Sequence, residues 1–170
     1  FARENREKMM FAVKAILEKW VGRYTQLAPA YEEEINCHHN YAALENHCGE
    51  NVWVHRKGAV RAGKDELTVI PGAMGSYSYV VRGLGNPESF CSSSHGAGRL
   101  YSRKGAMEAF SCEQVMVDLK DRGVFLGKKS KEDVAEESRF AYKNIDEVME
   151  NQRDLVTPVR RLRTVGVVKG

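Results

Sequence analysis

One stretch of the sequence combines the residue types that phosphate chemistry needs, since residues 92–99 read Ser-Ser-Ser-His-Gly-Ala-Gly-Arg. Small residues allow backbone N–H groups to approach a phosphate closely, and arginine offers phosphate oxygens a planar, permanently charged group. Between the serines and the glycines, His95 is placed to attack phosphorus or to pass a proton. Taken alone, a Ser/Gly-rich surface loop with an incidental histidine explains the stretch better, so its neighbours must decide.

His39 is the best candidate for a metal ligand, because imidazole binds manganese, iron, cobalt, nickel, copper and zinc ions. His38 precedes it, and adjacent residues of an extended segment point to opposite faces, so one of the two can serve a buried site. The alternative is a hydrogen-bonded core histidine, which is favoured for any isolated histidine. The nearby carboxylates lie in helices or acidic runs that favour solvent, so we expect the other ligands outside this chain.

Several further residues are candidates for holding a nucleotide or a phosphate. Residues 71–74 and Ser78 offer backbone N–H groups and a hydroxyl, although a plain turn between strands explains them equally well. Lys57 and Arg99 are candidates for phosphate contacts, with solvated surface charge as the alternative, favoured for Lys57. Tyr142 can stack or hydrogen-bond, whereas most tyrosines are half-buried packing residues.

Lys169 is the penultimate residue, a position that is normally frayed. The apolar residues 165–168 before it should dock the tail and place its ammonium group at a defined point. Docking alone does not make the lysine functional.

Composition and charge restrict the class of protein. The 170 residues are 42% hydrophobic and 29% charged, which is typical of a globular chain, and the net charge of +3 permits a phosphate-rich partner without demonstrating one. No P-loop, dinucleotide-binding fingerprint, H-E-x-x-H helix or G-x-S-x-G elbow occurs.

The cysteines and the absence of targeting segments favour a cytoplasmic protein with no membrane association. Four cysteines show neither C-x-x-C pairing nor zinc-site spacing, and no signal peptide or membrane-length apolar run is present. The chain opens on Phe1 without an initiator methionine, so we expect residues ahead of it.

The elements that must position these residues follow from periodicity. Residues 2–21 show apolar side chains at three- and four-residue spacing, which predicts a helix whose Met/aromatic stripe lies in the core. Residues 52–56, 67–70 and 76–81 are predicted strands, with a tight turn at residues 71–75 between the last two. Residues 35–41 are expected to be extended.

Helices are expected in the second half. Ser102 can cap a helix reaching residue 110, residues 112–120 form another, and Asn144 can cap a helix over residues 145–155. Ser130 and Asp133 resemble a capping box. The end, residues 159–168, is predicted to be a buried terminal strand. The fold class is therefore α+β, with mixed antiparallel β-sheets flanked by helices in one compact unit.

Six dispersed motifs, taken together and in order, closely resemble the RtcB family of RNA-splicing ligases. They occupy residues 37–41, 55–59, 70–75, 94–103, 141–146 and 168–170. The resemblance covers essentially the whole chain. Its order and spacing make it a highly specific signal, unlike any one of the motifs alone.

The resemblance implies an enzyme that uses GTP and Mn²⁺ to join RNA ends. One end bears a 2′,3′-cyclic phosphate or 3′-phosphate and the other a 5′-hydroxyl, in RNA repair or tRNA splicing. His95 would be the nucleophile that takes guanylate from GTP, and His39 a manganese ligand. His38, Lys57 and Arg99 would hold the RNA terminus. Residues expected around the guanylate are Asn40, Pro71, Gly72, Ala73, Met74, Ser78, His95, Gly96, Ala97, Gly98, Tyr142 and Lys169.

The resemblance further implies that residues 1–170 are the C-terminal part of an RtcB-like catalytic domain, incomplete without an N-terminal half that carries more metal ligands. It leaves open an activating protein partner. Two positions depart from the family, which often carries serine at Ala73 and cysteine at Ser93. The first departure removes a hydroxyl contact to the nucleotide.

Two other functions remain as alternatives. The chain can be a non-catalytic module that binds guanylate or RNA ends. A metal-dependent phosphohydrolase with His95 as proton donor is weaker, since nothing in the sequence indicates a metal-bound water.

Overall fold

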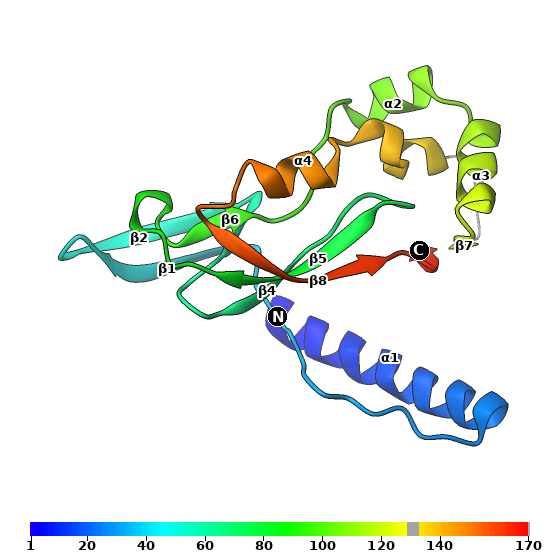
Figure 1. Cartoon of the computed structure of the whole chain (residues 1–170), viewed down its shortest axis with the longest axis horizontal. Helices are drawn as coiled ribbons and strands as arrows, with labels where there is room; N and C mark the ends of the chain where they lie inside the picture. The colour runs from blue at the N-terminus through cyan, green and yellow to red at the C-terminus, as the bar shows by residue number, and fades with distance from the viewer. Residues whose placement is uncertain (129–132, 170) are drawn as a thin grey trace. The chain divides into compact units, whose positions relative to one another are not determined.

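A computed structural model describes residues 1–128 and 133–169, apart from the side chain of Lys169. The chain forms two compact units, residues 1–38 and residues 39–170 (Figure 1). The sequence predicted a single compact unit. The boundary falls at the end of residues 27–38, which contain no regular secondary structure.

The first unit consists of one helix, α1 (Ala2–Thr25), and the segment that follows it. The predicted helix is confirmed and is four residues longer than expected, ending at Gln26 in a left-handed conformation. Its apolar stripe is not core, because α1 has no buried residue, and this prediction is wrong. A lone helix with one extended segment lacks the partner surface that would cover the stripe.

Polar contacts hold the segment to α1 within the first unit. Arg6 donates to the Asn36 side-chain oxygen at 2.8 Å and lies 3.0 Å from the His38 ring nitrogen. Lys14 pairs with Glu34. Exposed ion pairs of this kind add little stability. Because α1 also has no buried residue, little apolar packing stabilises this unit.

The second unit is an α+β arrangement, which confirms the predicted fold class. Its strands are β1 (Asn40–His47), β2 (Glu50–Lys57), β3 (Ala59–Arg61), β4 (Leu67–Ile70), β5 (Tyr77–Gly83), β6 (Ser92–Ser94), β7 (Phe125–Lys128), β8 (Val156–Arg163) and β9 (Gly166–Lys169). Its helices are η1 (Pro87–Ser89), α2 (Arg103–Ala109), α3 (Cys112–Asp121), η2 (Val134–Glu137), η3 (Arg139–Ala141) and α4 (Ile145–Glu150).

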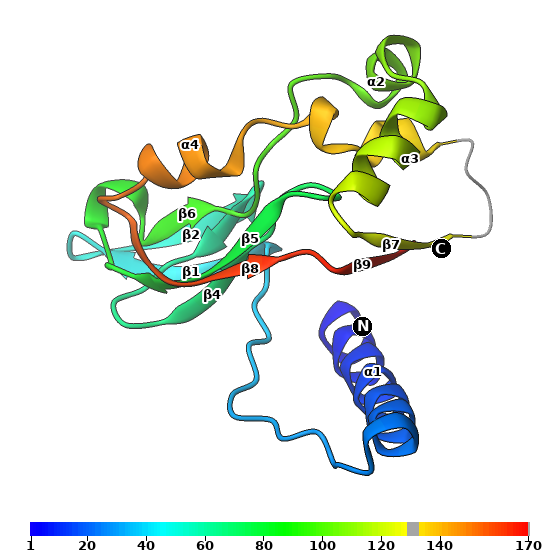
Figure 2. The ribbon, with the colours of Figure 1, turned by 45° about the vertical axis from the view of Figure 1, so that its right-hand side comes forward.

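The strands form small sheets rather than one large one. β1 pairs with β2, β3 with β6, and β5 lies between β4 and β8, all antiparallel. β7 and β9 are parallel and lie side by side near α3 (Figure 2). None of the helices in the described residues is both long and apolar enough to span a bilayer.

Two apolar clusters form the core of this unit. In the first, α4 packs over the β4–β5–β8 sheet through residues such as Ile145 and Val81. In the second, α3 packs against η2 through residues such as Leu119 and Val134. The first cluster includes Ala97 and the second Met74, so residues on either side of the candidate site are anchored in separate clusters.

The local signals for helix starts are confirmed. Ser102 caps α2 by accepting from the Gly105 N–H, and Asn144 caps α4, which ends at Glu150 rather than at residue 155. α3 begins with a capping box between Ser111 and Gln114. The box predicted at Ser130 and Asp133 lies partly outside the described residues.

The end of the chain differs from the prediction of one buried strand. It forms two strands, β8 and β9, and seven of the eight residues of β8 are exposed because β8 is an edge strand of its sheet. Arg160, Arg161 and Arg163 keep this edge charged, which discourages pairing with other chains.

A buried guanidinium ties the β1–β2 ribbon to β6. Arg56 on β2 is 2% exposed and donates to Glu45 on β1 through two nitrogens, at 2.5 and 2.9 Å. It also donates to the Ser92 hydroxyl at 3.0 Å and to the Phe90 carbonyl at 2.9 Å. Hydrogen bonds from Arg56 and His47, with the nearby positive charge, lower the pKa of Glu45 to about 2.

We expect acid to weaken the fold through Glu45. Its pKa is depressed in the folded chain, so its contribution is fully present above its ordinary pKa of 4.5 and is lost as the pH falls from 4.5 to about 2. The contribution is about 3 kcal/mol. Urea unfolding at a series of pH values measures it, and Glu45→Gln should flatten the curve in this window. A wild-type curve that is as flat as that of the variant would contradict the assignment.

Candidate functional site

A cavity of about 590 Å³ opens among four segments of the second unit, a size typical of small-ligand sites. Its walls come from the turn after β4, the segment after β6, the η2–η3 region and the end of the chain. The lining residues are Pro71, Gly72, Ala73, Met74, His95, Gly96, Ala97, Gly98, Arg99, Glu137, Tyr142, Thr164, Gly166 and Val167. The structure therefore brings together most of the residues that the sequence analysis placed around a nucleotide.

The turn after β4 forms one wall and is held from both sides. The Gly72 N–H donates to the Ser78 hydroxyl at 3.1 Å, so Ser78 supports the turn from behind the lining. The Ala97 N–H donates to the Pro71 carbonyl at 3.2 Å, which joins this wall to the His95 segment. A Cβ on Gly72 would lie 2.0 Å from the Tyr77 carbonyl oxygen, so only glycine fits there.

His95 lines the cavity and is held through its backbone. Its N–H donates to the Gly58 carbonyl at 3.4 Å, and the preceding Ser94 N–H donates to the side-chain oxygen of buried Gln152 at 3.0 Å. The ring of His39 stacks on the ring of His95, with centroids 5.8 Å apart and planes 8° from parallel. The candidate metal ligand His39 and the candidate nucleophile His95 are thus neighbours.

Arg99, Tyr142 and Glu137 form a connected side wall. Arg99 donates to the Glu136 carbonyl at 2.6 Å and to the Glu137 carboxylate at 2.9 Å, and it lies over the Tyr142 ring at 4.6 Å. The Tyr142 hydroxyl donates to Glu137 at 3.0 Å. Burial, then the bond to Glu137, raises the pKa of Tyr142, so it remains a neutral donor at neutral pH. A phosphate at Arg99 would compete with Glu137.

The remaining candidates lie outside the cavity lining. Asn40 and Lys57 are opposite each other at the end of the ribbon that follows His39. His38 belongs to the first unit, so its place relative to the site is not defined. The backbone of Lys169 lies in β9 opposite Lys128, and its side chain is outside the described part.

Sequence reasoning missed four lining residues, namely Glu137, Thr164, Gly166 and Val167. Glu137 belongs to an acidic pair that resembles ordinary solvated surface. Its only signal is its position five residues before Tyr142, within reach of the same wall. The other three flank the β8–β9 connection, whose course depends on parallel pairing with β7.

A divalent cation finds few ligands here. Among the described residues, no group of three or more His, Cys, Asp or Glu side chains is arranged to hold a metal ion. His39 and His95 supply imidazoles that suit Mn²⁺ but cannot complete its coordination. Further ligands would have to come from outside the described residues.

The fold and the cavity define an α+β protein with a histidine in the wall of a glycine-lined pocket. The family model "tRNA-splicing ligase RtcB" matches residues 1–170. The chain belongs to the RtcB family.

Similar proteins carry the same family name. The chain is 47% identical over 174 residues to an RNA-splicing ligase RtcB of Escherichia coli K12, covering 100% of this chain and 41% of that protein. It is 36% identical over 190 residues to an RNA-splicing ligase RtcB of Mycobacterium tuberculosis, covering 100% and 42%. A tRNA-splicing ligase RtcB of Thermococcus kodakarensis is 36% identical over 193 residues, covering 100% and 39%. The chain thus spans about two fifths of these relatives.

We expect Gly72→Ala to damage both the fold and the cavity. The added methyl group would meet backbone that cannot rotate away, so the free energy of unfolding should fall by at least about 2 kcal/mol. Gly127→Ala is a matched control, because its Cβ would meet nothing closer than 3.6 Å. Chemical denaturation of both variants is the measurement, and equal stabilities would show that the turn can relax.

Proposed function

We propose that this chain is the part of an RtcB-type RNA ligase that accepts guanylate on His95. The observation that carries the proposal is the position of His95 at a glycine-lined cavity and against His39. The names of the relatives support RNA ligation, including tRNA splicing, as the activity of the whole protein. The domain is then completed by residues outside this chain.

His95 acts as the nucleophile. An imidazole nitrogen attacks the α-phosphorus of GTP, a P–N bond forms, the bond to the β-phosphate oxygen breaks, and pyrophosphate leaves. Backbone N–H groups of Gly96 and Gly98 hold the α-phosphate close to the ring, while the Ala97 N–H, which donates to the Pro71 carbonyl, fixes the segment between them. This arrangement suits a reaction in which the same phosphate is transferred twice.

The guanylate lies in the cavity described above. The turn of Pro71, Gly72, Ala73 and Met74 lies across from the phosphate-binding segment, and Ser78 and Asn40 support the site from outside the lining. Tyr142 offers a neutral hydroxyl and a ring face. Because Ala73 lacks a hydroxyl, recognition here depends on backbone groups.

His39 is the residue of this chain that would hold Mn²⁺. The cation, when bound, would offset the charge of the triphosphate so that a neutral imidazole can attack it. Its other ligands come from the remainder of the protein. Lys169 supplies further positive charge at the nucleotide.

RNA is held chiefly through its phosphates. Lys57 and Arg99 hold the terminus that bears the 3′-phosphate, or the 2′,3′-cyclic phosphate after opening. Guanylate passes from His95 to the 3′-phosphate, and the 5′-hydroxyl of the second RNA then displaces GMP. Contacts of this kind weaken as salt rises.

A non-catalytic module that binds guanylate or RNA ends is the second candidate. The same glycine-lined cavity would serve such a module, which needs a pocket for the ligand but no nucleophile. The two candidates differ in whether a covalent adduct forms.

We expect His95→Ala to abolish the adduct. The full-length protein, incubated with Mn²⁺ and α-labelled GTP, should form a labelled adduct that is stable to alkali and labile to acid, as a phosphoramidate is. Lys104→Ala is the control, because Lys104 is exposed and forms an ion pair with Glu108 on α2. An adduct that persists in His95→Ala would assign the nucleophile elsewhere. A wild-type protein that binds guanylate without any adduct would favour the binding module.

We expect Lys169→Ala to slow guanylation without changing the melting temperature. The neighbouring Gly166 and Val167 of β9 line the cavity, which brings the strand to the site. Lys169→Arg should recover part of the rate because it keeps the charge. Single-turnover guanylation measures the effect, and an unaltered rate in Lys169→Ala would remove this lysine from the site.

A further inference from the structure

The β1–β2 ribbon has one outward face, and this face begins next to the His39–His95 pair. Side chains along the ribbon alternate between exposed and covered. The outward positions pair across the two strands as Asn40 with Lys57, Ala42 with His55, Leu44 with Trp53, and Asn46 with Asn51.

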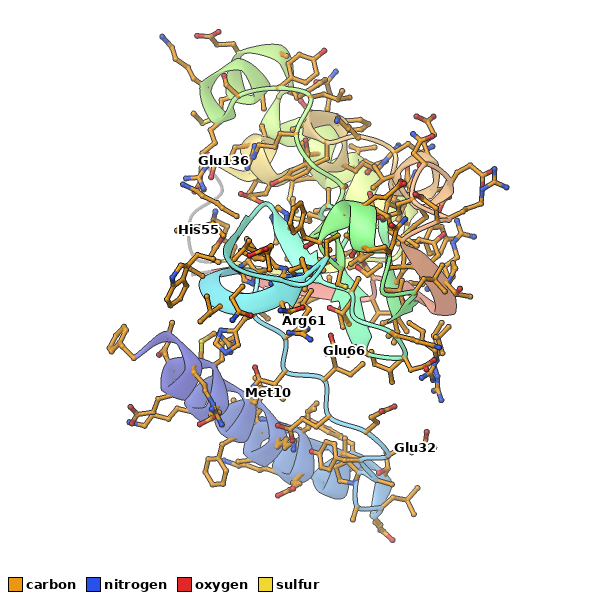
Figure 3. The ribbon with its side chains drawn as sticks, turned by 90° about the vertical axis from the view of Figure 1, so that its left-hand side faces the viewer. Met10, Glu32, His55, Arg61, Glu66 and Glu136 are labelled. Atoms are coloured by element: carbon orange, nitrogen blue, oxygen red, sulfur yellow. The ribbon has the colours of Figure 1, made fainter. Side chains whose placement is uncertain are left out.

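The centre of this outward face is apolar and aromatic. Trp53 is 66% exposed, and Leu44, directly opposite, is 56% exposed. His55 projects outward from β2 next to them (Figure 3). The opposite face of the ribbon makes the contacts with β6 through Arg56, so holding the ribbon in place does not require the indole.

The charge of the face suits a polyanion. It carries the ammonium group of Lys57 at the end near the site and has no carboxylate over residues 40–46 and 51–57. The Glu45 carboxylate is on the covered face, paired with Arg56. An exposed indole and a cation on the same face are the combination that binds unpaired nucleotides, through stacking and phosphate contact.

From this we infer that the outward face of the β1–β2 ribbon, centred on Trp53, is a stacking platform for unpaired bases of the RNA strand whose end reaches His95. The inference rests on the proposed ligase function and extends it from the RNA terminus to the nucleotides behind it. The substrate class is RNA with a single-stranded segment at the end to be joined.

The geometry of β2 determines the path that a bound RNA would follow. Two residues of a strand advance about 6.7 Å, so Trp53 lies about 13 Å along β2 from Lys57. An RNA strand whose terminal phosphate lies at His95 would pass Lys57 and then His55 before one of its bases reaches the Trp53 indole. The continuity of the face with the site, together with its lack of carboxylates, favours RNA as its occupant.

The test compares two substitutions of Trp53 in the full-length protein. Binding of a fluorescein-labelled single-stranded RNA with a 3′-phosphate is measured beside a blunt duplex that ends in the same group. Stacking of one base corresponds to about 5- to 150-fold in affinity, so Trp53→Leu should weaken single-strand binding within this range and leave duplex binding unchanged. Trp53→Phe keeps a ring and should retain most of the affinity.

Guanylation of His95 needs no RNA and should be the same in all three proteins. Absence of guanylation in the wild type would defeat the proposed ligase function, whereas the binding comparison would still test the platform. Equal single-strand affinity of wild type and Trp53→Leu would overturn the inference. Unchanged RNA affinity with a lower melting temperature in Trp53→Leu would show that protein covers the indole, and it would overturn the inference as well.

Discussion

The buried Arg56 guanidinium is the contact on which the candidate site depends. It hydrogen-bonds to β1 through Glu45, to the Phe90 carbonyl and to Ser92 at the start of β6. His39 directly precedes β1, and His95 directly follows β6. One side chain therefore joins the two strands next to which His39 and His95 lie. Burying a charge costs several kcal/mol unless its partners are complete, and removing one partner costs about 3–5 kcal/mol. Loss of any one of these partners is therefore expected to destabilise the whole set of hydrogen bonds around Arg56.

The cavity itself depends on backbone rather than on large side chains. Gly72 is in a turn where any Cβ would collide with Tyr77, and Gly98 has a φ of 73°, which favours glycine. Ala97 and Met74 anchor the opposing walls in different apolar clusters. A pocket lined in this way is fixed by its backbone, which is the preorganisation that the proposed phosphoryl transfer would require. The side wall of Arg99, Glu137 and Tyr142 adds the charged groups.

Individual strands and helix caps could be predicted from the sequence, whereas the pairing of strands that are distant in the sequence could not. The alternation of residues 67–70 and the caps at Ser102 and Asn144 predicted elements that the structure contains. The grouping of residues 71–74 with the His95 segment followed from the dispersed motifs and is present in the cavity. The parallel pairing of β7 with β9 joins residues about forty apart, for which no local pattern exists. The exposed stripe of α1 shows the other limit, because periodicity predicts a helix without predicting what covers it.

The contact between the two imidazole rings tests this account most directly. In the chain with isotope-labelled histidines and valines, nuclear Overhauser effects between ring protons of His39 and His95 report on the stacking of the two rings, whose centroids lie 5.8 Å apart. The account predicts that wild type shows these cross-peaks and that Arg56→Gln loses them, while methyl signals of the core residues Val81 and Val156 remain. Cross-peaks of full strength in Arg56→Gln would contradict the claim that this guanidinium holds the two histidines together.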